Sequence, residues 1–175
     1  MTTEQLRHRM PPILKALKER SLRGRTPVEG LRRTECAYHG WDTVHADAAS
    51  WEPFAPGDAF GGLEAHHCFK GTVTLPEASA GKRVVCLVST GASDIWNNNN
   101  PQFLAYVDGR LVCGLDVNHN EFDLAACAVP GESHELALYV YCNTPARDVF
   151  LRVETAERDD DVTGLYYDLR APYEV

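Results

Sequence analysis

Residues 100–124, NPQFLAYVDGRLVCGLDVNHNEFDL, decide the fold class of this chain. Two alternating apolar runs, 103–107 and 111–115, meet at the pair Asp108-Gly109. An Asp-Gly pair between such runs is the strongest short-range signal for a tight β-hairpin, because both central residues of the turn need positive φ. The stretch therefore predicts two antiparallel strands that continue into a polar segment.

Short strand-like runs separated by Gly, Pro, Asp and Asn extend on both sides of this hairpin. Such spacing is typical of an all-β sandwich and differs from the longer alternation of βαβ units. Eight strands are predicted, at residues 35–38, 67–75, 83–89, 103–107, 111–115, 121–124, 135–142 and 150–155. We therefore expect an all-β, jelly-roll-like (galactose-binding-like) β-sandwich that occupies residues 25–165.

A short helical arm is expected ahead of the sandwich, in residues 1–24. Thr2 or Thr3 can cap its helix, and Pro11 and Pro12 remove two backbone donors from the helix interior. Two short helices or one kinked helix are therefore expected. Apolar residues recur at helical spacing on one side of the arm: Leu6, Met10, Ile13, Leu14 and Leu17.

Six cysteines, none of them in a C-x-x-C pair, indicate a reducing, cytoplasmic setting. Several lie inside apolar strand-like runs, where a free thiol behaves as a small hydrophobe. The N-terminus is amphipathic and charged, unlike a signal peptide, and no stretch approaches the ~20 apolar residues of a membrane span. Secretion and membrane insertion are therefore not expected.

The net charge of −8 is distributed unevenly along the 175 residues. Residues 1–33 carry about +6 and the rest of the chain about −14. A basic segment can bind nucleic acid by neutralising phosphates. The uneven charge is explained better by a solvated, basic helix face that docks on an acidic neighbour. We therefore expect no nucleic-acid partner.

Motifs for nucleophilic catalysis and for phosphate binding are missing from the sequence. It contains neither a G-x-S-x-G elbow nor the glycine-rich loops G-x-x-x-x-G-K-[ST] and G-x-G-x-x-G. Carboxylates are plentiful, but no cue selects the pair that a glycosidase needs. We therefore expect no catalytic residue in this chain, and a stand-alone hydrolase ranks last among the possible functions.

Histidine and cysteine residues invite a metal hypothesis. His66 and His67 are adjacent on a predicted strand and point to opposite faces, so they cannot share one ion without a bulge. Cys36 and His39 supply half of a zinc site, and no second pair follows at ordinary finger spacing. A metal site drawn from Cys36, His39, His66 and Cys68 remains an alternative. The leading expectation is that this chain has no metal site.

The polar string after the hairpin imitates a calcium loop at its first, third and fifth positions. Glu121 replaces the glycine of the sixth position and Cys127 the bidentate Glu of the twelfth, which rules out an EF-hand. Asp116, Asn118 and His119 are expected either to order a strand end through bonds to nearby backbone or to contact a ligand.

Sugar recognition usually combines an aromatic platform with hydrogen-bonding groups, because a pyranose has an apolar face and a polar rim. Trp41 beside Asp42, and Trp96 beside a run of four asparagines, have this composition. Each can also plug an end of the sandwich. The candidate carbohydrate-binding residues are Trp41, Trp96, Asn98, Asp116, Asn118 and His119.

Residues 60–76, FGGLEAHHCFKGTVTLP, carry a resemblance to a known family. They are similar to the sequence Gly-Gly-x-Asp-Ala-His, followed by an aromatic strand that ends in Pro, of the N-terminal domain of α-mannosidases of glycoside hydrolase family 38. Glu64 stands where that family has Asp, and Cys68 where Trp is common. Residues 80–85, 107–121 and 166–169 resemble the next strand, the hairpin and the link into the mannosidase barrel.

The resemblance implies a noncatalytic scaffold that packs against the catalytic domain of a cytoplasmic α-mannosidase. It places the zinc and the catalytic carboxylates in a downstream domain of the same polypeptide, and no cofactor in this chain. Residues 166–175 would then be the start of the linker to that domain. The alternative is a carbohydrate-binding module that recognises mannosides itself.

Overall fold

The computed structural model of this chain describes residues 3–91 and 101–174. Its helices are α1 (Thr3–Ser21) and α2 (Asp160–Glu174), with short 3-10 helices η1 (Gly40–His45) and η2 (Glu77–Ser79) in loops. Its strands are β1 (Leu22–Pro27), β2 (Leu31–Cys36), β3 (Glu52–Phe54), β4 (Ala59–Thr74), β5 (Arg83–Ser89), β6 (Gln102–Val107), β7 (Arg110–Leu115), β8 (Glu121–Ala125), β9 (Ser133–Phe150) and β10 (Arg152–Arg158).

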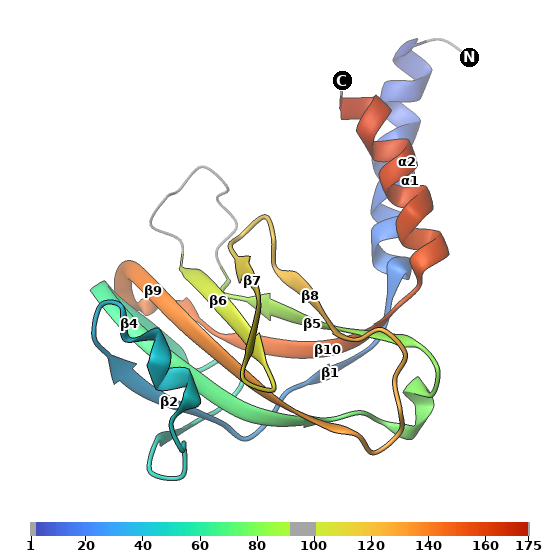
Figure 1. Cartoon of the computed structure of the whole chain (residues 1–175). Helices are drawn as coiled ribbons and strands as arrows, with labels where there is room; N and C mark the ends of the chain where they lie inside the picture. Colours follow the sequence, from blue (N-terminus) through green and yellow to red (C-terminus); the bar gives the residue numbers. More distant parts are fainter. Residues whose placement is uncertain (1–2, 92–100, 175) are drawn as a thin grey trace.

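Two antiparallel sheets form a sandwich from which the two helices project side by side (Figure 1). The six-stranded sheet has the order β3-β2-β4-β9-β6-β7, and the four-stranded sheet has the order β1-β10-β5-β8. The predicted all-β sandwich with an N-terminal helix is therefore confirmed.

The hairpin that the Asp-Gly pair predicts joins β6 to β7. Asp108 has φ 50° and Gly109 has φ 73°, the two positive values that its turn requires. Both carboxylate oxygens of Asp108 are bonded, one to Nδ1 of His134 and the other to the backbone amide of Glu135, each at 2.9 Å. The turn is thereby tied to the neighbouring strand β9.

Strand lengths differ most from the prediction in β4 and β9. Strands β5 to β8 begin and end within one residue of their expected bounds, whereas β4 has 16 residues and β9 has 18. The predicted strand begins at residue 67, but β4 and β9 pair on both sides of Gly61-Gly62 through a shift in register. Strands β1 and β3 are absent from the predicted set.

The core lies between the sheets and is built by alternate residues of each strand. Leu136, Leu138 and Val140 of β9 face inward, opposite residues of the other sheet such as Val84 and Val88. Each fully buried aliphatic side chain of this kind stabilises the fold by about 1.5–3 kcal/mol. A smaller cluster on the outer face of the six-stranded sheet includes Val44, Trp51, Cys68, Tyr106 and Tyr139.

Helix α1 continues through Pro11 and Pro12, so the expected alternative of two short helices is wrong, and a kink at this place stays a prediction. A proline at position 11 leaves the carbonyl of Arg7 without its usual helical donor. The hydroxyl of Tyr173, in α2, donates a bond to that carbonyl at 3.4 Å. The partner helix thus compensates for part of what the proline removes.

Helix α2 covers residues 166–174, which the sequence analysis assigned to the start of a linker. Asp159 caps it, because its carboxylate accepts a bond from the amide of Val162 at 3.1 Å and its carbonyl accepts one from the hydroxyl of Thr163 at 2.7 Å. The amide of Asp159 also donates to the carbonyl of Ser21, at the end of α1. The expected continuation into a further domain stays a prediction.

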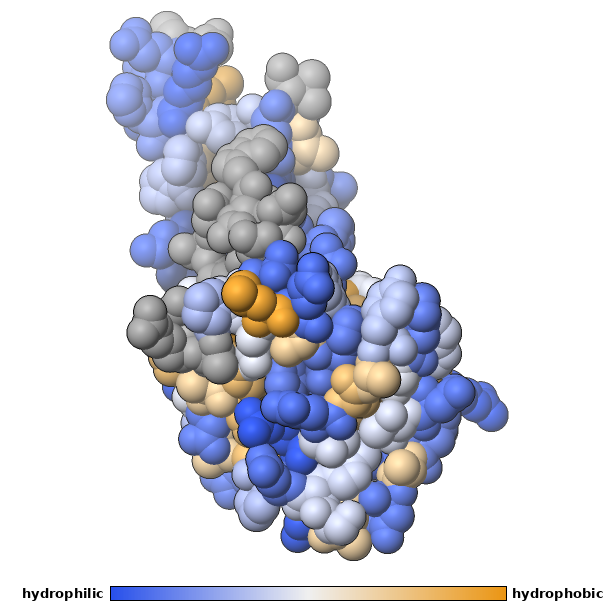
Figure 2. Space-filling view, turned by 90° about the vertical axis from the view of Figure 1, so that its left-hand side faces the viewer, coloured by the Kyte–Doolittle hydropathy of each residue, from blue (hydrophilic) through white to orange (hydrophobic). Residues whose placement is uncertain are grey.

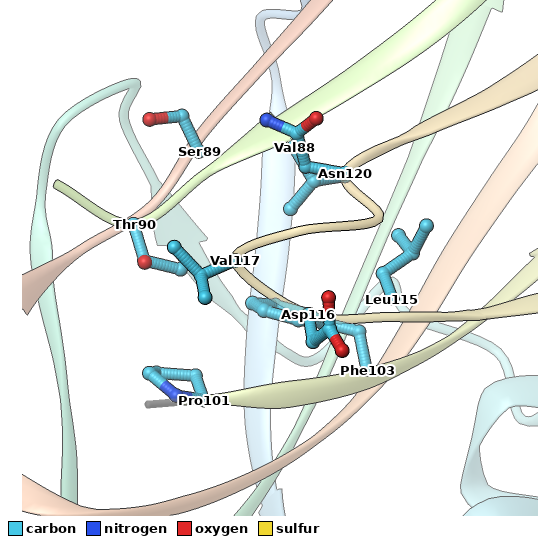
Figure 3. Close-up of a pocket in the computed structure, with 9 residues that line it drawn as sticks. All are labelled: Val88, Ser89, Thr90, Pro101, Phe103, Leu115, Asp116, Val117 and Asn120. Carbon is cyan, nitrogen blue, oxygen red and sulfur yellow. The ribbon is translucent and has the colours of Figure 1, made fainter. Parts of the chain in front are cut away.

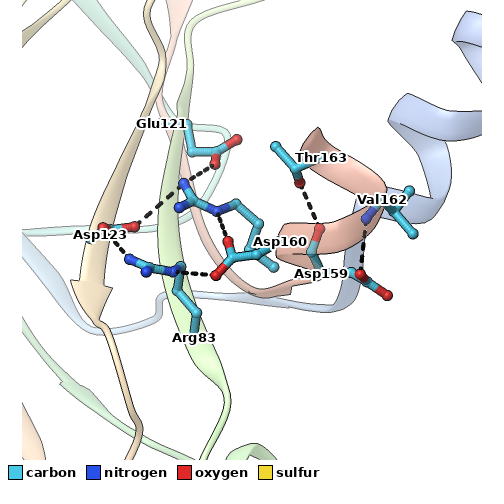
Figure 4. A network of polar contacts seen from close by, with 8 residues as sticks. Arg83, Glu121, Asp123, Asp159, Asp160, Val162 and Thr163 are labelled. Carbon is cyan, nitrogen blue, oxygen red and sulfur yellow. Dashed lines mark hydrogen bonds and ion pairs between the residues drawn. The ribbon is translucent and has the colours of Figure 1, made fainter. Parts of the chain in front are cut away.

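An ion-pair network joins the start of α2 to the four-stranded sheet (Figure 4). Asp160 is bonded to Arg83 of β5 and to Arg158 of β10, each at 2.9 Å. The same arginines contact Asp123 of β8, at 2.6 and 3.4 Å. Helix α2 is therefore anchored at its base to β5 and β10, whose arginines also pair with β8.

The side of the molecule in Figure 2 is mostly hydrophilic, with hydrophobic residues in small separate patches on the sandwich. The helix pair on this side is also mainly hydrophilic. Among residues 3–91 and 101–174, no helix combines the length and the apolar composition needed to cross a bilayer.

Candidate functional site

A groove runs across the outer face of the six-stranded sheet. It consists of two adjoining pockets of about 760 and 350 Å³ that share Gln102, Leu104, Tyr139 and Tyr141. These volumes are in the range of ligand pockets. We call the two together the outer-face groove; its further lining residues are Cys36, Ala37, Tyr38, His39, Trp41, Glu64 and His66 in the larger part and Phe103, Gly114, Leu115 and Asp116 in the smaller part.

The alternation of the strands places the shared residues in this groove. Successive side chains of a strand point to opposite faces, and Leu138 and Val140 of β9 are fully buried in the core. Tyr139 and Tyr141 therefore face outward. They are paired in register with Leu104 and Gln102 of β6, so four side chains from two strands form the floor.

Aromatic rings form a connected wall along the larger part of the groove. Trp41, in η1, meets Tyr139 edge to face with ring centroids 6.3 Å apart. His66 of β4 stacks on Tyr139 at 5.7 Å, and Tyr38 lies 5.5 Å from His66. Tyr38 is 72% exposed and Trp41 40% exposed, so both rings are available to the apolar face of a sugar.

A β-bulge in β4 brings Glu64 to the same part of the groove. The pairing of β4 with β9 shifts register on either side of Gly62, which has φ 142°. A Cβ atom at Gly62 would lie 2.9 Å from that of Ala65, so only glycine fits. The carbonyl of Gly61 accepts a bond from Nε2 of buried His67 at 3.2 Å. Bulges commonly re-aim a side chain in this way.

Two residues with unfavourable backbone angles line the groove. His39 has φ 59° and Glu64 has φ 52°, and a positive φ is uncommon outside glycine. Both belong to the lining of the larger pocket, together with His66. Backbone strain of this kind clusters at ligand sites, because the surrounding structure must hold the residues in place.

Polar groups of the groove are held in fixed positions. The hydroxyl of Tyr139 and Nδ1 of His66 are joined by a hydrogen bond of 2.8 Å. Burial raises the pKa of Tyr139 above its ordinary value, so its hydroxyl stays protonated at neutral pH. A fixed hydroxyl and imidazole offer a directed pair of hydrogen-bonding groups to the hydroxyls of a sugar.

The predicted carbohydrate-binding residues are divided among three places. Trp41 lies in the larger part of the groove and Asp116 in the smaller part. Asn118 and His119 are exposed in the loop after β7. Trp96 and Asn98 lie outside the described residues.

Asp116 orders its own loop. Its Oδ1 accepts bonds from the backbone amides of Asn118 and His119, both at 2.7 Å. The bond from the His119 amide is the main cause that lowers the pKa of Asp116 below its ordinary value. The geometry thus fits the structural role that the sequence allows, and a sugar contact by Asp116, Asn118 or His119 stays a prediction.

A small cavity of about 40 Å³ lies beside this loop, at the end of the sandwich (Figure 3). Its lining residues come from β5, β6, β7 and the segment after β7, and they include Val88, Phe103 and Asn120. The volume corresponds to a few water molecules, well below that of a ligand site. The cavity shares Phe103, Leu115 and Asp116 with the smaller part of the groove, and it is too small to add a ligand site of its own.

The loose metal set of the sequence analysis does not form a site. Sγ of Cys68 lies 3.6 Å from Sγ of Cys36, and burial raises the pKa of both thiols, while His39 and His66 line the groove. Among the residues that the structure describes, no group of three or more His, Cys, Asp and Glu is arranged to hold a metal ion.

Sequence reasoning missed most of the groove. Tyr38, Tyr139 and Tyr141 are not among the predicted site residues, and His66 was considered only as a metal ligand, although the four form the wall and floor. The alternation within residues 135–142 could have predicted that the two tyrosines face outward, because the positions between them and before them, which face inward, are Val and Leu.

Comparison with known proteins relates the fold to glycosidases. No family model matches the sequence, and no curated protein matches it. Solved structures of β-glucuronidases from Ruminococcus gnavus and from an uncultured Clostridium species are similar at TM-scores of 0.55 and 0.54, with 8% and 9% identity. That of Faecalibacterium prausnitzii β-glucuronidase is similar at a TM-score of 0.51 with 14% identity.

These structures correct the resemblance drawn from the sequence. The matches cover 78%, 79% and 79% of this chain but 29%, 30% and 32% of the three glucuronidases, so the chain spans about three-tenths of their length. The neighbours are β-glucuronidases and not α-mannosidases, and the assignment to family 38 is wrong. The zinc of a downstream domain was implied by that assignment alone and is no longer expected. The likeness establishes the fold of an all-β sandwich.

Proposed function

We propose that this chain is a noncatalytic, carbohydrate-binding sandwich domain that serves a larger glycoside hydrolase. The observation that carries the proposal is the outer-face groove, in which Tyr38 and Trp41 expose aromatic faces beside directed polar groups. A pyranose needs this combination of an apolar face and hydrogen-bonding partners. Strained backbone at His39 and Glu64 supports a binding role for the same groove.

The accessory role is supported by size and by the neighbours. The matched region is about three-tenths of each β-glucuronidase, and no catalytic motif appears in this sequence. A catalytic domain of the same polypeptide is the proposed partner. The six free cysteines support a cytoplasmic location for that polypeptide. The purified chain is expected to release no product from aryl glycosides.

Calorimetric titration of the purified chain with neutral oligosaccharides tests binding, with manno-, cello- and chito-oligosaccharides in the panel. We expect millimolar or tighter affinity for at least one, weakened about 3- to 10-fold by Tyr38→Ala and by Trp41→Ala. Tyr167→Ala is the matched control, because Tyr167 is an exposed aromatic residue on α2. Flat titrations with the whole panel, or equal losses in all three variants, would overturn the proposal.

A further inference from the structure

We infer that the outer-face groove selects chains of amino sugars over uronic acids, with neutral sugars between them. This inference rests on the proposed function, because it concerns the charge preference of the same groove. The structural neighbours are β-glucuronidases, whose name denotes an anionic sugar, a uronic acid. The preference inferred for the groove is for sugars of the opposite charge.

Carboxylates occupy both parts of the groove. Glu64 lines the larger part, and Asp116 lines the smaller part. Among the described residues that line either part, none is a lysine or an arginine. Arginine and lysine are the residues that pair with a ligand carboxylate. A uronate in the groove would therefore meet negative charge with no guanidinium or ammonium group in the lining, where His39 and His66 are the residues that can become cationic.

Glu64 is the carboxylate best placed to act on a ligand. The bulge that carries it places it in the same pocket as Tyr38 and Trp41, and its side chain is exposed to the groove. Asp116 directs one oxygen to the amides of its own loop, as described above. A cationic sugar stacked on the aromatic wall would thus lie beside Glu64, and an anionic sugar would be repelled by it.

The shape of the groove favours a chain over a single sugar. Its ends are Tyr38, after β2, and Asp116, after β7, and four steps between neighbouring strands separate β2 from β7. Strands are spaced about 4.8 Å apart, so the groove extends roughly 19 Å across the sheet. Its two parts share their floor, which lets one extended ligand occupy both.

Three oligosaccharides of equal length test the charge preference: glucosamine oligomers, their neutral N-acetyl forms, and oligogalacturonides. Titrations at pH 6 and low salt are expected to give about tenfold tighter binding for the cationic oligomer than for the neutral one, and about tenfold weaker binding for the uronide. Salt at 0.5 M should reduce both differences to less than threefold, because exposed charges are then screened.

The variant Glu64→Gln should remove most of the preference at low salt and keep the affinity for the neutral oligomer. Glutamine keeps the size of the side chain, and Glu77→Gln is the control, since Glu77 is exposed in η2 and does not line the groove. Equal affinities for all three ligands, or unchanged preference in Glu64→Gln, would overturn the inference and leave the proposed function intact. No binding of any ligand would overturn both.

Discussion

Replacing Gly62 by alanine should destabilise the sandwich more than the same replacement at a glycine that has a positive φ but has room for a Cβ atom. Gly62 has φ 142°, outside the left-handed helical region, and a Cβ there would lie 2.9 Å from the Cβ of Ala65. Strained backbone of this kind costs about 1–3 kcal/mol, and Ala65 must also move. We therefore expect a loss of about 2–4 kcal/mol in the free energy of unfolding.

Gly131→Ala is the matched control. Gly131 has φ 78°, and an added Cβ would meet nothing within 4 Å, so the expected loss is only the left-handed penalty of about 1 kcal/mol. Urea unfolding followed by tryptophan fluorescence measures both values. In thermal unfolding the same losses correspond to about 10 °C for Gly62→Ala and about 3 °C for Gly131→Ala.

Ligand affinity provides a second readout of the same change. The bulge at Gly62 carries Glu64 to the groove, so Gly62→Ala should also weaken sugar binding at temperatures where the variant is folded. Gly131 lies in the turn before β9 and should not affect binding. The reasoning is refuted if the two variants lose equal stability, because the contact with Ala65 would then contribute nothing.

Three further predictions concern the core, α2 and pH. Leu138→Ala should lower the free energy of unfolding, measured with denaturant, by about 2–5 kcal/mol, because Leu138 is fully buried. Leu111→Ala, at an exposed position, should lower it by less than about 1 kcal/mol. Similar losses in the two variants would contradict the assignment of Leu138 to the core. Asp159→Ala should lower stability by about 1 kcal/mol and reduce helical circular dichroism, and unchanged values would exclude the cap. The hydrogen bond with His134 lowers the pKa of Asp108 below its usual value of 3.8. The ionised Asp108 therefore stabilises the folded state above pH 3.8, and this stabilisation is lost as the pH falls through the lowered pKa. Asp108→Asn should therefore flatten the acid limb of a stability–pH curve, and an unchanged limb would exclude this contribution.

Strands whose bounds are set by neighbouring residues could be predicted from the sequence. The turn at Asp108-Gly109 needs two positive φ values, and the sequence there offers residues that tolerate them. Strand β5 is an unbroken apolar run and has the predicted bounds. These elements are specified by residues close in sequence, which is why the sequence alone predicts them.

Elements that depend on distant residues were harder to predict. Pro11 indicates a break in α1, but Tyr173 of α2 donates to the carbonyl that the proline leaves free. Residues 166–174 were expected to begin a linker, although they belong to a helix whose Asp160 pairs with arginines of β5 and β10. Tyr173 and Arg83 lie far in the sequence from the residues that they contact, and a pattern read along one segment contains no trace of these two contacts.

The candidate site was predicted only in part for a related reason. Trp41 was chosen by composition and does line the groove, because η1 lies over the outer face of the sheet. Tyr139 and Tyr141 look like ordinary strand residues until β6 and β4 are placed beside β9. A groove across a sheet is assembled from one or two residues of each strand, so its members are scattered in sequence.

The glycine pair of β4 shows why a short motif misled the assignment of family. Gly61 and Gly62 were compared with a family motif, yet both have conformations that glycine adopts most easily, at φ 113° and 142°. The bulge they form shifts the pairing of β4 with β9. Any sandwich that needs a bulge at this place would select glycine there, whatever reaction its parent enzyme performs. The motif is therefore evidence for the local geometry of a strand, and the function must be argued from the side chains that this geometry places in the groove.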